Sequence, residues 1–140
     1  MALVKYIDEA QASPRVLAVY QDIKQTRQVE SINNFWRALA NDPETLERTW
    51  HSLKAIMAPD GALDPLVKEL IYVAVSITNG CDYCTVSHLA AARKAGLTAQ
   101  MRNELISVVG MANETNRLSR GYLVDIDAAL LQAASSIGEE

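Results

Sequence analysis

The sequence predicts an all-α protein of about six to seven helices. Three observations support this prediction: apolar residues recur at helical spacing, proline repeatedly follows a capping residue, and strand patterns are nearly absent. The chain has 140 residues, 49% of them hydrophobic, which is enough to bury one core. Because no linker or internal repeat divides it, we expect residues 1–140 to form a single domain.

Three helices are expected in the N-terminal half. Residues 13–26 form the first, because a Ser-Pro pair supplies the N-cap and the first helical residue. A short apolar helix follows over residues 32–40. The third helix begins at Asp42 and Pro43. Its inner face is expected to carry Leu46, Trp50, Leu53, Ile56 and Met57.

The fourth expected helix runs from Pro65 to about Thr78, with Asp64 as its N-cap. It is apolar on nearly all sides, so we expect it to be the central buried helix. Asn79 and Gly80 end it, since glycine tolerates the left-handed conformation that closes many helices.

The remaining helices follow with little connecting chain. A fifth covers about residues 81–95, and a sixth covers about residues 98–118. Gly121 is expected to interrupt the sixth helix. A last short helix then starts at Asp125 or Asp127.

Charge and hydropathy argue against nucleic-acid and membrane binding. The net charge is −4 and the basic residues are scattered, unlike the clustered positive charge of nucleic-acid binders. The longest near-apolar run, residues 70–77, is too short to span a bilayer. The N-terminus lacks the charged start and long apolar region of a secretory signal. We therefore expect a cytoplasmic protein.

The two cysteines, Cys81 and Cys84, form a C-x-x-C pair at the start of the fifth helix. In a reducing compartment such a pair is rarely a structural staple, which leaves a metal half-site, a redox pair or core packing. His88 lies on the same helix face, one turn beyond Cys84. The helix start favours a thiolate, and a histidine can accept its proton. These features favour a redox-active dithiol.

Three other interpretations remain open at this point. Core packing of the cysteines is disfavoured by their polar neighbours and by the histidine in phase with them. A zinc site could use Cys81, Cys84 and His88, but it lacks a fourth ligand, since the only other histidine is His51. A thioredoxin-type oxidoreductase needs a strand before the motif, and no strand is predicted. We expect no bound metal or cofactor.

The spacing Glu69-x(11)-Cys81-x-x-Cys84-x(3)-His88 resembles the signature of the AhpD-like alkyl hydroperoxidases, within the carboxymuconolactone decarboxylase superfamily. The similarity is strong over about residues 63–98, the expected redox core. Further on, the run 113–118 resembles the peroxidase-related branch of small AhpD-like proteins. The N-terminal third is similar to the family only in its helical character.

This resemblance implies an all-helical thiol peroxidase that assembles as a homo-oligomer, a trimer or a hexamer, and reduces small hydroperoxides. Cys84 would attack the peroxide, Cys81 would close the disulfide, and Glu69 and His88 would form a proton relay. A lipoyl- or thioredoxin-type protein would act as the external dithiol reductant. The runner-up function is a general disulfide reductase, or a redox relay or sensor, without significant peroxidase activity.

Two features qualify the assignment of roles within this motif. Helix-dipole reasoning alone favours Cys81 as the more acidic thiol, whereas proton delivery by His88 favours Cys84, which we follow. Tyr83 precedes Cys84 at a position where the best-characterised family members have a second histidine. Tyrosine can donate a hydrogen bond, but with an ordinary pKa of about 10 it is a poor base at neutral pH. We therefore give Tyr83 a supporting role, and the substitution bears on the efficiency of peroxide reduction.

Overall fold

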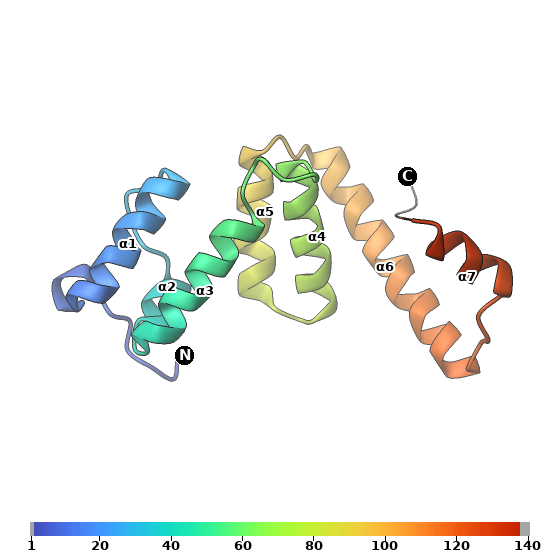
Figure 1. Cartoon of the computed structure of the whole chain (residues 1–140), viewed down its shortest axis with the longest axis horizontal. Helices are drawn as coiled ribbons and strands as arrows, with labels where there is room; N and C mark the ends of the chain where they lie inside the picture. The colour runs from blue at the N-terminus through green and yellow to red at the C-terminus, as the bar shows by residue number, and fades with distance from the viewer. Residues whose placement is uncertain (1, 138–140) are drawn as a thin grey trace. The chain divides into compact units, whose positions relative to one another are not determined.

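A computed structural model describes residues 2–137, which form seven α-helices, one short 3₁₀ helix and no strand (Figure 1). The elements are η1 (Glu9–Gln11), α1 (Pro14–Arg27), α2 (Asn34–Leu39), α3 (Pro43–Ile56), α4 (Pro65–Thr78), α5 (Asp82–Lys94), α6 (Ala99–Tyr122) and α7 (Ala128–Ser135). The all-α prediction is confirmed. The chain divides into two compact units, one through Ala62 and one from Leu63 onward. That residues 1–140 fold as a single domain stays a prediction.

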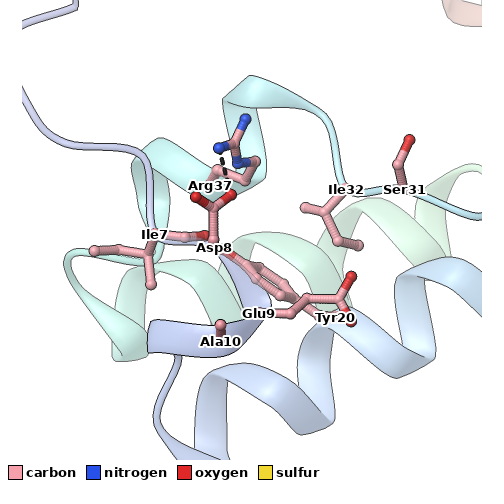
Figure 2. Close-up of a pocket in the computed structure, with 8 residues that line it drawn as sticks. All are labelled: Ile7, Asp8, Glu9, Ala10, Tyr20, Ser31, Ile32 and Arg37. Atoms are coloured by element: carbon pink, nitrogen blue, oxygen red, sulfur yellow. Dashed lines mark hydrogen bonds and ion pairs between the residues drawn. The ribbon is translucent and has the colours of Figure 1, made fainter.

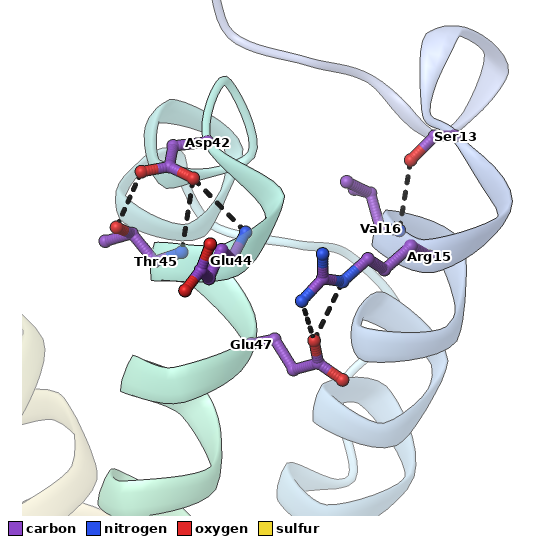
Figure 3. A network of polar contacts seen from close by, with 7 residues as sticks. All are labelled: Ser13, Arg15, Val16, Asp42, Glu44, Thr45 and Glu47. Atoms are coloured by element: carbon purple, nitrogen blue, oxygen red, sulfur yellow. Dashed lines mark hydrogen bonds and ion pairs between the residues drawn. The ribbon is translucent and has the colours of Figure 1, made fainter.

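Side-chain caps start the first and third helices where the sequence predicts them. The Ser13 hydroxyl accepts a hydrogen bond from the Val16 amide at 3.4 Å (Figure 3). Asp42 accepts hydrogen bonds from the amides of Glu44 and Thr45 at 3.2 and 3.3 Å. The Thr45 hydroxyl also donates to Asp42, and this hydrogen bond lowers the pKa of the Asp42 carboxyl. Each cap precedes a proline at the first helical position, so both helix starts are encoded locally.

The first unit has an aromatic core. Trp36 on α2 and Trp50 on α3 are each 1% exposed, and their rings meet edge to face with centroids 5.4 Å apart. The Arg27 guanidinium lies 5.6 and 5.5 Å from the two ring centroids, within the range of a cation–π contact. At the surface, Arg15 Nε donates to Glu47 at 2.8 Å and links α1 to α3 (Figure 3).

The second unit is built on a helical hairpin. Its helices α4 and α5 are antiparallel neighbours, and α6 packs against α4 (Figure 1). Val73 on α4 and Ala92 on α5 are fully buried. Asn113 on α6 donates a hydrogen bond to the Thr78 hydroxyl at 3.0 Å, which ties α6 to the end of α4. None of the helices in the described part of the chain combines the length and apolar character needed to cross a membrane.

Three expectations about these helices are wrong. Ile56 is 66% exposed, because it is the last residue of α3 and lies beyond the packed face. Gly121 does not interrupt α6, which continues to Tyr122; a single glycine lowers helix propensity without breaking a helix. Helix α4 is not buried on all sides, since Ile71 and Val75 are 49% and 51% exposed. Within the second unit, α5 and α6 thus leave one apolar face of α4 uncovered.

We expect Asp22 to be important for the stability of the first unit. Its carboxylate accepts a hydrogen bond from the buried Trp50 indole at 2.7 Å and contacts Lys54 Nζ at 2.7 Å. The bond to Lys54, and next the bond to Trp50, lower the pKa of Asp22. Asp22→Ala leaves the indole N–H without its acceptor and should lower the free energy of unfolding by about 1–3 kcal/mol. Asp22→Asn keeps an acceptor and should lose less.

Urea denaturation of the three proteins at neutral pH measures this difference. Because the folded-state pKa is lowered, the part of the Asp22 contribution that needs its charge is complete above the ordinary aspartate pKa and is lost as the pH falls through the lowered value. A protonated Asp22 keeps a neutral acceptor for the indole, so the parent should converge in stability with Asp22→Asn at acidic pH, while Asp22→Ala stays less stable. Equal stability of the three proteins at neutral pH would contradict this role.

Candidate active site

The turn that ends α4 determines where Cys81 lies. Gly80 has a φ of +69°, a left-handed conformation that glycine adopts without strain. The Cys81 amide then donates to the carbonyl of buried Ser76 at 2.9 Å, as in a Schellman motif. The predicted helix stop at Asn79 and Gly80 is confirmed, and it places the first cysteine at the start of α5.

Cys81 and Cys84 form a disulfide in the first turn of α5, with Cα atoms 5.3 Å apart. Cys81 is the N-cap residue, and its Sγ accepts a hydrogen bond from the Cys84 amide at 3.2 Å. Both side chains are partly exposed. The pair is therefore seen in its oxidised form, at a helix terminus where backbone N–H groups favour negative charge.

Glu69 and His88 form a hydrogen-bonded pair across the hairpin. Glu69 lies in the first half of α4 and His88 lies in the middle of α5, yet Oε2 and Nδ1 are 2.7 Å apart. The two side chains are only 16% and 12% exposed. A carboxylate that binds Nδ1 favours the tautomer with the proton on that nitrogen and leaves Nε2 as the nitrogen that can serve another group.

The spacing along α5 connects the two pairs. Cys84 and His88 are four positions apart in an unbroken helix, which places them on one face, separated by about 6 Å along the axis. The structure thus brings the four residues Glu69, Cys81, Cys84 and His88 together as two bonded pairs on one hairpin. Tyr83, in the same helical turn as the disulfide, is 44% exposed.

Tyr72 is a residue of this site that sequence reasoning missed. Its ring stacks on the His88 imidazole with centroids 3.6 Å apart and an interplanar angle of 16°. Tyr72 is three positions after Glu69 on α4, so both side chains lie on the helix face toward α5. The three-residue spacing from Glu69 was a signal for the contact between Tyr72 and His88. A tyrosine within an apolar helix, however, is typical of ordinary core packing.

The zinc interpretation has no support in the geometry. Within residues 2–137, no three side chains of His, Cys, Asp or Glu converge as they would to hold a metal ion. His51, the second histidine, is exposed on α3 in the first unit. In the structure both cysteine sulfurs are bonded to each other rather than held as thiolates.

The first unit contains a cavity of about 390 Å³ (Figure 2). Its charged groups are already engaged, because Arg37 pairs with Asp8 and Glu9 pairs with Lys24. The Tyr20 hydroxyl in its wall donates to the carbonyl of Ile7 at 2.8 Å. We therefore assign this cavity no ligand.

The chain belongs to the carboxymuconolactone decarboxylase family, whose sequence model matches residues 43–127. The solved structure of an alkylhydroperoxidase AhpD core from Rhodospirillum rubrum is similar to it, with a TM-score of 0.90 and 46% identity. That similarity covers 94% of this chain and 98% of the Rhodospirillum chain. The AhpD-like resemblance of the C-x-x-C segment is confirmed.

Two curated relatives are more distant. An uncharacterized protein encoded in the cox locus of Paracoccus denitrificans is 34% identical over 64 residues, which are 46% of this chain and 58% of that protein. An uncharacterized protein of Cupriavidus necator is 31% identical over 87 residues, which are 62% of this chain and 75% of the relative. The chain thus spans little more than half of the Paracoccus protein.

We expect the disulfide to open reversibly without unfolding the chain. Cys81 and Cys84 are three positions apart, so the loop closed by the disulfide is short and contributes about 2 kcal/mol in the chain-entropy account. Thiol titration should find no free thiols in the oxidised protein and two per chain after phosphine reduction, in keeping with its two cysteines. Far-UV circular dichroism should be the same in both states. Loss of helicity on reduction would identify the disulfide as a structural staple.

Proposed function

We propose that this chain is a thiol-dependent peroxidase that reduces small hydroperoxides through a dithiol–disulfide cycle. The observation that carries the proposal is the pairing of a disulfide at the start of α5 with His88, whose imidazole is held by Glu69. A nucleophilic thiol needs a base to ionise it and a proton donor for its leaving group, and one positioned imidazole can do both. The similarity to an AhpD core described as an alkylhydroperoxidase supports the same reaction.

The first chemical step is the attack of reduced Cys84 on the peroxide. The Cys84 thiol transfers its proton to Nε2 of His88, and the thiolate attacks the terminal oxygen of the hydroperoxide. The S–O bond forms as the O–O bond breaks, and His88 returns the proton to the leaving alkoxide, which departs as an alcohol. Glu69, bonded to Nδ1, stabilises the imidazolium between the two transfers.

The second step closes the disulfide. Cys81 attacks the sulfur of the Cys84 sulfenic acid, the S–S bond forms, and the hydroxyl leaves as water with the remaining thiol proton. An external dithiol, a lipoyl- or thioredoxin-type protein, then reduces the disulfide by thiol–disulfide exchange. It supplies the two electrons that reduce the peroxide to alcohol and water. A compartment that maintains dithiols, the cytoplasm, suits this cycle.

Thiol counting in defined variants tests this assignment. After stoichiometric alkyl hydroperoxide, the reduced parent should lose both of its thiols. Cys81→Ser should accumulate a sulfenic acid that dimedone captures, and Cys84→Ser should consume no peroxide. His88→Ala should slow thiol loss by about 10²–10⁴-fold, whereas His51→Ala, at an exposed position of the other unit, should leave the rate unchanged.

Unchanged thiols in a folded parent would refute the peroxidase proposal. If the parent then still reduces a protein disulfide with turnover, the second candidate, a general disulfide reductase or relay, takes its place. The observation that favours this candidate is Tyr83, a partly exposed tyrosine next to Cys84. Tyrosine is a poor base at neutral pH, so it does not add a second proton acceptor for peroxide reduction. A single oxidation without turnover would instead indicate a redox sensor.

We also propose that the chain works as a homo-oligomer, a trimer or a hexamer. Val67, Ile71 and Val75 recur every four positions on α4, so they form one apolar stripe, and they are 40%, 49% and 51% exposed in the single chain. In the last helix, Leu130 and Leu131 are 62% and 55% exposed. Monomeric proteins rarely leave large contiguous apolar patches in water. Contact with other copies of the chain would bury these apolar side chains.

Light scattering coupled to gel filtration measures the oligomer directly. The parent should have the mass of three or six chains. The double substitution Ile71→Glu and Val75→Glu places charges in the stripe and should yield smaller species, while Ser52→Glu, at an exposed position of α3, should leave the mass unchanged. A parent that runs as a single chain at micromolar concentration would contradict the proposal.

A further inference from the structure

We infer that Tyr72 is a positioning residue, whose ring holds the His88 imidazole with Nδ1 toward Glu69 and Nε2 free for the dithiol. This inference rests on the proposed function, because the orientation of Nε2 matters most if His88 moves protons for a thiol. Its structural basis is separate, namely the stack of the two rings with centroids 3.6 Å apart and planes 16° from parallel.

The hydrogen bond to Glu69 does not by itself determine the imidazole plane. A hydrogen bond tolerates a range of angles, and the Glu69 carboxylate can move with the ring, so the imidazole can rotate about its χ1 and χ2 bonds while the 2.7 Å contact is kept. Such a rotation displaces Nε2, on the far side of the ring, relative to the dithiol. Contact with a flat surface removes this freedom, and Tyr72 provides that surface.

The position of Tyr72 is itself linked to the backbone of the dithiol. It lies in the middle of α4, and its carbonyl accepts a hydrogen bond from the Ser76 hydroxyl at 2.7 Å. The Ser76 carbonyl in turn accepts a hydrogen bond from the Cys81 amide at 2.9 Å. One stretch of α4 therefore positions both the ring that stacks on His88 and the backbone of the first cysteine.

The aromatic ring, rather than the hydroxyl, carries this role. The contact with the imidazole is made by the face of the Tyr72 ring. Tyr72→Phe is therefore a matched control that keeps the stack, and Tyr72→Leu keeps an apolar residue of good helix propensity but removes the flat face.

Nitrogen-resolved NMR of the two histidines in the oxidised protein tests the inference without any turnover. At a pH where imidazoles are neutral, His88 in the parent and in Tyr72→Phe should show one fixed tautomer with the proton on Nδ1, and ring protons shifted by the stacked tyrosine. In Tyr72→Leu, Glu69 should still hold the proton on Nδ1, but nuclear Overhauser contacts from the His88 ring protons to α4 should weaken, because the imidazole plane is no longer fixed. His88 ring-proton contacts in folded Tyr72→Leu that match those of the parent overturn the inference.

A kinetic experiment uses the same variants after reduction of their disulfide. Tyr72→Leu should lower the rate of peroxide-driven thiol loss by about tenfold to a hundredfold, as expected when a reacting group is misplaced, and Tyr72→Phe should match the parent. A parental rate in Tyr72→Leu overturns the inference. A parent that consumes no peroxide, but whose His88 is fixed only when an aromatic ring is present at position 72, refutes the proposed function and supports the positioning role.

Discussion

The tight turn between α4 and α5 is the constraint on which the geometry of the second unit depends. Gly80 adopts a left-handed conformation, and the Cys81 amide closes the turn on the Ser76 carbonyl. The chain therefore reverses within three residues, and α5 returns antiparallel to α4 (Figure 1). This reversal brings residues from the first half of α4 opposite the middle of α5, and it leaves the cysteine pair at a helix start.

The hairpin gives the two cysteines different surroundings. Cys81 is the N-cap, and its sulfur accepts a backbone amide at 3.2 Å, so negative charge there is stabilised by the helix start. Cys84 is one turn from His88, whose ring is held by the carboxylate of Glu69 and by a stacked tyrosine. A proton acceptor and a hydrogen-bonded anion site thus lie beside different sulfurs, an asymmetry that supports the proposed roles of Cys84 as the attacking thiol and Cys81 as the resolving thiol.

The two units differ in how completely they bury their apolar side chains. In the first unit, Trp36 and Trp50 are buried by three short helices, and Asp22 satisfies the indole N–H of Trp50. In the second unit, α4 has more apolar surface than α5 and α6 cover, and Ile71 remains half exposed in the single chain. Local burial is therefore complete around the aromatic core but incomplete around the hairpin that carries the dithiol.

Local sequence determined the helix boundaries and half of the candidate site. Caps such as Ser13 and Asp42, and the stop at Gly80, act through neighbours a few residues away, so they can be recognised without tertiary structure. The Cys81–Cys84 pairing is equally local. The prediction that Gly121 interrupts α6 was wrong, because helix propensity is a weak preference and the helical hydrogen bonds continue past this glycine.

Only the tertiary structure decided how the two halves of the site meet. The contact between Glu69 and His88 spans 19 positions, and spacing alone does not determine which face of α4 turns toward α5. The family resemblance singled out Glu69, but nothing in a mostly apolar helix distinguished Tyr72 from a core residue. Its role became visible in the folded hairpin, because stacking depends on the relative rotation of two helices, which packing sets and local sequence does not.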